Sequence, residues 1–349
     1  MEKLVFVSTS LVGEGNPATA LAVGNLIEKA GHAVERGLLN LSAIPARLFH
    51  RSMRTSRHLG QEYTDHSEGL RRLAIPVLGA LSKIEHSLRF RQMFTPTKSP
   101  RMLVAVQEHQ LGGYSEEKLK KSFPGGRFLV IPDVEPKDSA VKLMRDLGIT
   151  PIVWNEQAQV RLTDLGFDPK LVAPFLPKGF MNGYSDLGPL SPRIVVKTSG
   201  SGISPIHRDN LRQALDVLGI EYKIYLPGEV LSQGQKVKRV GPLSKRISEF
   251  YDDIVSQPPT LLISPPSEMI QVGSVLLQRG TSLCPLPPNG AHERVNLEWA
   301  ERMGLCQKLL NPDDNMLISR ISHQFGASKS PRICDGIGTT SIVEALGLR

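Results

Sequence analysis

The chain is poor in the features that mark disulfide-rich, metal-binding and membrane-spanning proteins. Its 349 residues contain three cysteines, Cys284, Cys306 and Cys334, which lie far apart and form no CxxC pair. This spacing argues against a zinc site and a disulfide framework, and is typical of a reducing compartment. No apolar run approaches the ~20 residues that cross a bilayer. One lysine before a short "LVFV" is too little for a signal peptide. We therefore expect a cytoplasmic protein without a metal site.

Aromatic residues are also scarce, at 5% of the chain, and no known nucleic-acid recognition motif occurs. Proteins that bind single strands stack bases on such rings, so nucleic acid is disfavoured as a partner. Positive charge, in contrast, is abundant. The net charge is +8, and eleven basic against four acidic residues lie between Arg47 and Arg101. This stretch fits an anionic partner, such as a phosphate-bearing substrate or phospholipid heads, or a solvated arginine-rich surface.

An amphipathic helix is expected within the basic stretch, from Ser67 to Phe94. Its apolar residues recur every three or four positions, its other face is basic, and a kink is expected at Pro76. Such a helix either packs on its own domain or lies on a membrane surface. Peripheral association with the membrane therefore stays open beside the cytoplasmic location.

A chain of 349 residues exceeds a typical single core and indicates two domains. A proline- and glycine-rich stretch at 174–192 is expected to link them. Strand-like runs alternate with helical segments on both sides of this linker, which predicts an α/β fold with parallel sheets. The expected strands lie at 3–9, 33–39, 101–107, 127–132, 150–155, 193–198, 221–226, 260–264 and 281–287. The expected helices lie at 17–30, 205–218, 269–278, 292–303 and 338–348.

The first strand is followed by a small-residue loop, "GEGNPATA" at 13–20. Gly13, Gly15 and Ala18 match the G-x-G-x-x-A form of the dinucleotide fingerprint, and Glu35 lies about 20 residues on. Several residues separate the strand from Gly13, however, and Glu35 falls inside the next strand. This spacing disfavours an NAD site, and it leaves open that the glycines only permit a turn.

A comparable loop, "SGSGISP" at 199–205, follows the strand "RIVVKT" and opens a helix. Free backbone N–H groups and the helix dipole favour a diphosphate at this point, and small side chains let it approach. We therefore expect Ser199, Gly200, Ser201 and Gly202 to contact an anionic group. Many βα turns use glycine and serine without a ligand, so a plain turn is the alternative.

A third polar stretch follows the strand at 281–287, and ligands of open α/β sheets bind beyond such strand ends. Asn289 lies in a Pro-Pro-Asn-Gly loop, and His292, Glu293 and Asn296 crowd the first turn of the next helix. These side chains are candidates to hold sugar hydroxyls, and helix capping by Asn289 or Glu293 is the alternative. The apolar residues that recur every four positions on this helix are Val295, Trp299 and Met303.

Taken together, these elements resemble the GT-B glycosyltransferases, and in particular their MurG-like branch, over nearly the whole chain. The first loop is similar to the G-x-G-G-H-x-x-P-x-L-A motif of that branch. The matching residues of this motif are Gly13, Gly15, Pro17, Leu21 and Ala22. "TSGSG" resembles its Gly-Gly-Ser loop and "QRGTSLCPLP" its G-x-P strand. Asn296 and Gly304 match the asparagine of its Q-x-x-N-A motif and the glycine that follows.

The resemblance implies two Rossmann-like domains that face each other across a cleft. It implies an N-terminal acceptor-side domain at 1–180 and a C-terminal nucleotide-sugar-binding domain at 190–330. A helix at 331–349 is expected to cross back to the first domain. The implied reaction moves a sugar from a nucleoside-diphosphate sugar, such as a UDP-sugar, to a hydroxyl acceptor that bears phosphate or lipid. It uses no metal and no other cofactor.

The same resemblance assigns roles to site residues. Glu14 is the expected base, which takes the proton of the acceptor hydroxyl. The serine- and glycine-rich loop is expected to stabilise the leaving diphosphate, and Glu293 and Asn296 to hold the sugar. One position departs from the family: Val275 stands where a glutamate holds the ribose, and Glu268 is the nearest carboxylate.

Three alternatives stay open. The departure at Val275 also fits a catalytically silent or regulatory α/β protein that binds a nucleotide or another anion. A sugar-nucleotide epimerase needs the same two-domain plan. A nucleic-acid binder is allowed by the basic stretch alone, and a steep salt dependence of oligonucleotide binding is the evidence it needs.

Overall fold

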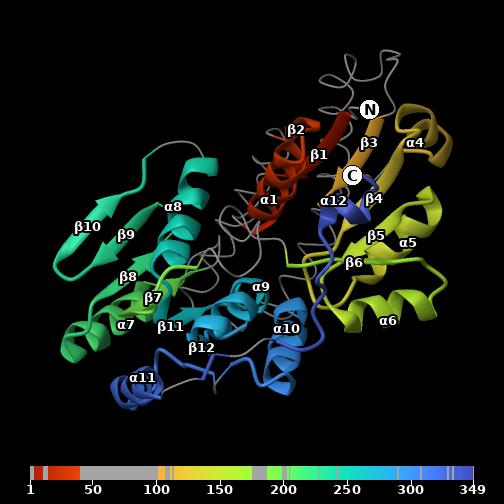
Figure 1. The fold of residues 1–349 in the computed structure, drawn as a ribbon. Helices are drawn as coiled ribbons and strands as arrows, with labels where there is room; N and C mark the ends of the chain where they lie inside the picture. The colour runs from red at the N-terminus through yellow and green to blue at the C-terminus, as the bar shows by residue number, and fades with distance from the viewer. Residues whose placement is uncertain are drawn as a thin grey trace.

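The chain forms two α/β halves that lie side by side, each built on one six-stranded sheet (Figure 1). The computed structural model describes residues 4–10, 15–39, 101–106, 111, 114–174, 187–198, 203, 205–226, 228–240, 243–288, 291–306, 309–327, 330–331 and 334–348. The basic stretch up to residue 100, with the helix expected at 67–94, lies outside the described residues. So do residues 175–186 of the expected linker.

All neighbouring strands of the first sheet run parallel, in the order β2-β1-β3-β4-β5-β6. Its strands are β1 (Leu4–Ser10), β2 (Ala33–Leu39), β3 (Arg101–Ala105), β4 (Gly126–Val130), β5 (Thr150–Val153) and β6 (Lys170–Leu171). Its helices are α1 (Gly15–Lys29), α4 (Glu116–Ser122), α5 (Asp138–Leu147) and α6 (Glu156–Asp164). The expected βα alternation is therefore confirmed in this half.

The second sheet has the order β10-β9-β8-β7-β11-β12. The neighbours β8, β7, β11 and β12 run parallel, whereas β9 is antiparallel to both β8 and β10. Its strands are β7 (Ser191–Lys197), β8 (Tyr222–Tyr225), β9 (Glu229–Ser232), β10 (Gln235–Lys238), β11 (Pro259–Ser264) and β12 (Ser282–Pro285). Its helices are α7 (Pro205–Leu218), α8 (Leu243–Ser256), α9 (Pro266–Leu276) with the 3-10 turn η3 (Leu277–Arg279), α10 (Ala291–Arg302) and α11 (Leu317–Gly326). The last helix of the chain is α12 (Ile342–Ala345).

Strand side chains alternate between two faces, and this alternation builds three cores. In β1, Val5 and Val7 face a large cluster shared by both halves, whereas Phe6 faces the cluster beneath α4, α5 and α6. In β7, Val195 enters the shared cluster and Val196 faces the cluster beneath α7 and α11. Each sheet therefore has a core of its own on one side and a common core on the other.

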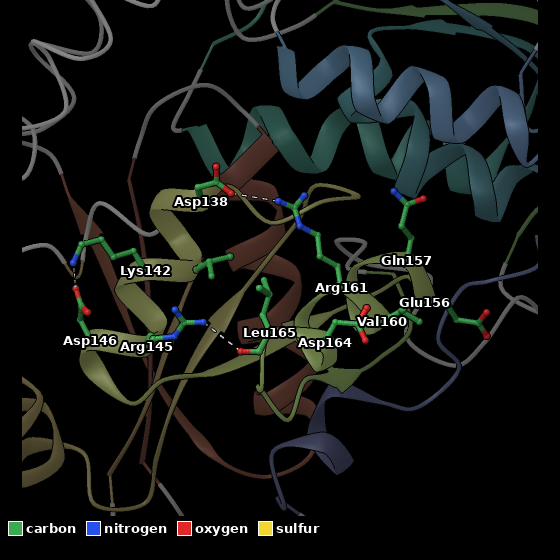
Figure 2. A pocket seen from close by; sticks show the side chains of 11 residues that line it. Asp138, Lys142, Arg145, Asp146, Glu156, Gln157, Val160, Arg161, Asp164 and Leu165 are labelled. Atoms are coloured by element: carbon green, nitrogen blue, oxygen red, sulfur yellow. Dashed lines mark hydrogen bonds and ion pairs between the residues drawn. The ribbon is translucent and has the colours of Figure 1, made fainter.

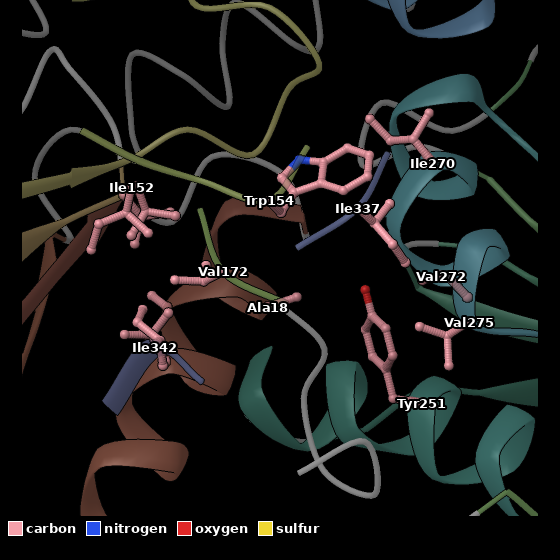
Figure 3. Packing of buried hydrophobic residues seen from close by; sticks show 14 of the residues in the cluster. Ala18, Ile152, Trp154, Val172, Tyr251, Ile270, Val272, Val275, Ile337 and Ile342 are labelled. Carbon is pink, nitrogen blue, oxygen red and sulfur yellow. The ribbon is translucent and has the colours of Figure 1, made fainter. Parts of the chain in front are cut away.

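The common core fills the junction between the halves (Figure 3). We call this part of the cluster the seam, and define it by Ala18, Trp154, Tyr251, Ile270, Val275, Trp299 and Ile337. These residues come from α1, α8, α9, α10 and the segments after β5 and before α12. Burying such apolar surface is the main favourable term in protein association. The seam therefore holds the two halves together.

The C-terminal segment lies against the first half. Ile337 forms an antiparallel bridge with Asn155, and the Gly338 N–H donates to the Trp154 carbonyl over 2.9 Å. A Cβ at Gly338 would lie 2.3 Å from the Val172 carbonyl oxygen, so only glycine fits this close approach. Farther on, α12 packs against α1, and His32 Nε2 donates to the Leu348 carbonyl over 2.6 Å.

Two expectations about elements need correction. The helix expected at 338–348 is only the short α12, because the preceding residues are extended and bond to the first half, as the Ala173 N–H does to the Thr340 carbonyl. The sequence patterns also missed the β9–β10 hairpin, whose turn places Gly234 at φ 62°. In contrast, α7 spans 205–218 as expected.

Candidate functional site

The strand order of the second sheet reverses at β7, whose neighbours are β8 on one side and β11 on the other. The connections from β7 and β11 lead to α7 and α9, which cover opposite faces of the sheet. Connections that part in this way leave a crevice beyond the carboxyl ends of the strands, where α/β proteins bind ligands. The residues at these two strand ends, Lys197 with Thr198 and Ser264, therefore mark the candidate site.

Two buried cations lie at this edge of the sheet. Lys197 is 3% exposed, and its Nζ lies 5.1 Å from the centre of the Phe250 ring. The Arg239 guanidinium is also buried and lies 5.7 Å from the centre of the Tyr225 ring, which meets Phe250 edge to face. Arg239 also donates to the Leu226 carbonyl over 3.0 Å. Because aromatic faces attract cations, Phe250 of α8 and Tyr225 of β8 hold these two side chains near the carboxyl edge of the sheet. Glu249 of α8 pairs with the Arg239 guanidinium at 3.2 Å.

A polar pair joins the connections that leave β11 and β12. Ser267 lies in the first turn of α9, and its hydroxyl donates to Glu293 Oε1 over 2.9 Å. Glu293 lies in the first turn of α10 and is 4% exposed. A carboxylate is rarely buried unless polar partners hold it. Ser267 was not among the predicted site residues, although its place directly after a strand end was a signal for it.

Asn296 faces the first half of the molecule. Its side chain is fully buried, Oδ1 accepts from the Val134 N–H over 3.1 Å, and Nδ2 donates to Asp133 Oδ1 over 3.3 Å. Both partners lie in the connection that follows β4. Glu293 and Asn296 therefore share one face of α10, but the first reaches α9 and the second reaches the other half.

The other predicted site residues lie at the limits of the described chain. Gly13, Glu14, Ser199, Gly200, Ser201, Gly202 and Asn289 lie outside the described residues. Gly15 is the first residue of α1, Glu268 is in the first turn of α9, and His292 is the second residue of α10. The backbone thus places Glu268 and His292 beside Ser267 and Glu293 in sequence, at the same two helix ends.

Val275 belongs to the seam rather than to a polar site. It is 2% exposed on α9 and packs in the shared cluster with Tyr251 and Ile337 (Figure 3). A glutamate at this position would be surrounded by apolar side chains. The valine at this position therefore makes an apolar contact between the halves.

A second buried ionic cluster lies near the amino ends of β7 and β8, away from the switch point. Arg193 is fully buried and pairs with both oxygens of Asp253, at 3.0 and 2.9 Å, and Lys223 reaches the same carboxylate at 2.7 Å. Burial alone would raise the pKa of Asp253, but the hydrogen bonds from Lys223 and Arg193 outweigh it and lower the pKa. Burial also raises the pKa of Tyr225. These groups anchor α8 to the sheet.

A surface groove of about 950 Å³ runs between α5 and α6 of the first half (Figure 2). Val160 and Leu165 give it an apolar part. Its cations already have partners in the same groove or beside it: Lys142 pairs with Asp146, Arg161 with Asp138, and Arg145 donates to the Leu165 carbonyl. Such self-paired charges leave little reason to expect a charged ligand there.

Glu35 does not take the place of a ribose ligand. It is exposed at the third position of the edge strand β2, opposite Phe6 of β1. Four more residues of β2 follow it, so it does not lie at the carboxyl end of the strand. A dinucleotide is bound beyond the carboxyl ends. This placement gives the NAD interpretation no support.

Among the described residues, no group of three or more His, Cys, Asp or Glu side chains is arranged to hold a metal ion. No helix within the described ranges is both long enough and apolar enough to cross a membrane.

The fold defines the class of protein: two α/β halves with mostly parallel sheets, a switch point in each, and a C-terminal segment that returns to the first half. No protein-family model matches the chain, and no curated protein matches it either. Solved structures that are similar to this chain include a UDP complex of UGT89C1 and the enzyme MurG. UGT89C1 from Arabidopsis thaliana, complexed with UDP, shares 12% identity at a TM-score of 0.52, over 94% of this chain and 90% of its own. MurG from Acinetobacter baumannii shares 13% identity over 93% and 90%, at a TM-score of 0.43. The expected GT-B fold is confirmed.

Proposed function

We propose that the protein is a glycosyltransferase, which moves a sugar from a nucleoside-diphosphate sugar to a hydroxyl acceptor. The observation that carries the proposal is the Ser267–Glu293 pair, whose buried carboxylate lies in the connections that follow β11 and β12 of a GT-B fold. The buried lysine Lys197 ends β7, the strand next to β11 in the same sheet. UGT89C1, which has the same fold, is complexed with UDP, and this supports a nucleotide-linked donor.

The proposed donor site lies on the second half, at 190–330. Lys197 and the start of α7 stabilise the negative charge that develops on the leaving diphosphate. Glu293 accepts hydrogen bonds from sugar hydroxyls, because a carboxylate can hold Ser267 and other donors at once. In this proposal Glu14, directly before α1, is the base, and no metal takes part.

The proposed acceptor side is the first half, at 1–180, joined by the segment 331–349. Its basic stretch fits an acceptor that carries phosphate or a lipid-linked phosphate, since clustered cations attract anions. The switch point of the first sheet lies between β1 and β3, so the residues after β1 are suited to meet an acceptor.

A nucleotide panel tests the donor. Ligands that bind the native state raise the melting temperature by mass action, so we expect a shift with one nucleotide and its sugar conjugate among the uridine, guanosine and thymidine diphosphates. Transfer is then followed by mass spectrometry with hydroxyl and lipid-phosphate acceptors, with and without a chelator. The absence of any shift across the panel contradicts the proposal.

Lys197 and Glu14 give two further tests. The variant K197M should weaken binding of UDP and of inorganic diphosphate by about ten-fold, as loss of a charged hydrogen-bond donor does. K245M on the exposed face of α8 is the matched control and should bind normally. E14Q should slow turnover far more than it weakens donor binding, and equal losses in both would remove Glu14 as base.

A nucleotide-binding protein without catalysis is the second candidate. It is favoured by Val275, which sits in the seam where the resembling enzymes have a ribose-binding glutamate. Binding of a nucleotide without sugar release or transfer to any acceptor would select this candidate. Conversion of one nucleotide sugar into its epimer would instead identify an epimerase.

A further inference from the structure

The buried stripe of α10 is polar at its start and apolar at its end. Glu293 and Asn296 are followed on the same face by Trp299, which is 3% exposed, whereas Val295 is half-buried. Residues three apart on a helix share a face. Thus Asn296 is fully buried, whereas the apolar Val295 beside it is not. The hydrogen bonds of Asn296 give the reason for a polar residue at this buried position.

The partners of Asn296 belong to a connection that is held from both sides. Trp154 of the first half donates from Nε1 to the Pro132 carbonyl over 2.9 Å. Asn296 of the second half meets the next two residues, through the Asp133 carboxylate and the Val134 N–H. An asparagine can accept and donate at once, which an apolar or a carboxylate side chain cannot do. The amide of Asn296 therefore supplies both the acceptor that the Val134 N–H needs and the donor that the Asp133 carboxylate needs.

The polar contacts between the halves continue along α10. Arg302 donates to Gln157 Oε1 over 2.8 Å, and Gln157 donates to Glu135 Oε1 over 2.6 Å. Glu135 follows Val134 in the same connection. The helix that carries Glu293 is thus fixed to the first half at two points, Asn296 and Arg302, which lie about one turn and about two and a half turns after Glu293.

We propose that Asn296 is a positioning residue, a latch that joins the halves and fixes the first turn of α10 so that Glu293 faces the donor. It is not a ligand of the sugar. The reason is access: its side chain is fully buried between the halves, and both ends of its amide are bonded to Asp133 and Val134. The part that concerns the donor rests on the proposed function.

A reciprocal exchange tests the latch. N296D places a second carboxylate against Asp133, and like charges at this distance repel. The double variant D133N/N296D restores one donor and one acceptor with the roles reversed, since the amide now at position 133 can donate to the carboxylate now at position 296. Energetic coupling between two contacting residues shows as non-additive effects in such a cycle.

The readouts are the melting temperature and the dissociation constant for UDP-glucose, or for the sugar nucleotide that the panel selects. N296D should lower the melting temperature and weaken donor binding by about ten-fold, and the double variant should return within about three-fold of the wild type. D133N alone should have a small effect, because an amide oxygen still accepts from Asn296. Binding by N296D should also recover as the pH falls, because protonation of one carboxyl restores a donor.

N210D is the matched control. Asn210 also donates to an aspartate, Asp313 Oδ1, over 3.3 Å, but both residues lie in the second half. It should leave donor binding unchanged. Loss of binding in N296D that D133N does not rescue would make Asn296 a sugar ligand and overturn the proposal, as would normal binding and stability in N296D.

The proposed function can fail separately. If the wild type binds no sugar nucleotide, the contact between Asn296 and Asp133 is still tested by melting temperatures. These are compared among the wild type, N296D, D133N and the double variant. Rescue by the double variant then supports the latch between the halves, and equal destabilisation of the single and double variants overturns it.

Discussion

Trp154 and Trp299 meet edge to face across the junction of the two halves, with ring centroids 5.3 Å apart and planes inclined by 83°. They are the only two tryptophans of the chain. One follows β5 of the first half, and the other lies on α10 of the second. Such a pair is worth about 0.5–1.5 kcal/mol beyond the area that it buries. The contact is also a built-in probe of whether the halves are joined in solution.

The first prediction concerns this pair. Two indoles in contact couple their electronic transitions and give a couplet in the far-ultraviolet circular dichroism spectrum. W154F and W299F should each abolish the couplet and destabilise the protein by about 1 kcal/mol. W154F should cost more, because it also leaves the Pro132 carbonyl without its donor. A wild-type spectrum without a couplet that depends on both tryptophans would contradict the contact.

The second prediction places a glutamate at position 275. Because the Val275 side chain is 2% exposed within the seam, V275E should cost about 3 kcal/mol or more in unfolding free energy. V160E, at a position 59% exposed on α6, is the control and should change stability by at most about 0.5 kcal/mol. Urea denaturation measures both. A stable V275E that binds UDP more tightly would instead place a ribose site there.

The third prediction tests Glu293. E293Q keeps an oxygen for the Ser267 hydroxyl but loses the charge, so donor binding should weaken by about ten-fold. E298Q changes an exposed glutamate of the same helix and should bind as the wild type does. Calorimetric titration with the sugar nucleotide that the panel selects gives the comparison. Equal affinities of the two variants would remove Glu293 from the site.

The fourth prediction concerns pH and the Arg193–Asp253 pair. The pKa of Asp253 is lower in the folded state than its ordinary value of 3.8. The contribution of the Asp253 carboxylate to the free energy of unfolding is therefore complete above about pH 4, and it is lost as the pH falls through the folded-state pKa of Asp253. D253N leaves the Arg193 charge buried without its partner and should cost about 3 kcal/mol at neutral pH.

The difference between D253N and the wild type should shrink as the pH falls below about 4. Thermal unfolding followed across this range checks the trend. D252N, at the exposed neighbouring position on α8, should stay close to the wild type at every pH. A constant gap between D253N and the wild type would show that the carboxylate charge is not what stabilises the cluster.

The fifth prediction concerns the C-terminal segment. G338A puts a Cβ 2.3 Å from the Val172 carbonyl oxygen and should cost about 2 kcal/mol. G326A, where no atom lies within 4 Å of the added Cβ, should be near neutral. Differential scanning calorimetry and limited proteolysis compare the two. Equal stability would mean that residues 334–348 do not pack on the first half as described.

Local patterns were sufficient for the general fold. Each strand run followed by an amphipathic segment predicts a βα unit, and the spacing of Leu211, Leu215 and Leu218 on one face predicted α7 at 205–218. The hairpin of β9 and β10 was missed because β10 is exposed along its whole length and lacks alternating apolar residues. The final helix was overestimated because extended residues near Gly338 bond to the first half rather than to one another.

The candidate site was predictable only in part. The stretch around Glu293 was found because polar residues follow a strand end, but its partner Ser267 belongs to a different connection. Lys197 was overlooked, although a lysine that ends a buried strand is itself a signal. The fourfold spacing suggested that Val295 faces the core, whereas the structure buries Asn296.

By itself the sequence determined that this chain folds as two α/β halves, because the alternation of strands and helices is written in local spacing. Only the tertiary structure decided what lies between them. The Val134–Asn296 contact joins residues 162 positions apart, and the two tryptophans meet only after both halves have formed. Whether a side chain at the junction meets an apolar core, a backbone amide or a ligand depends on its distant neighbours, and no local pattern contains them.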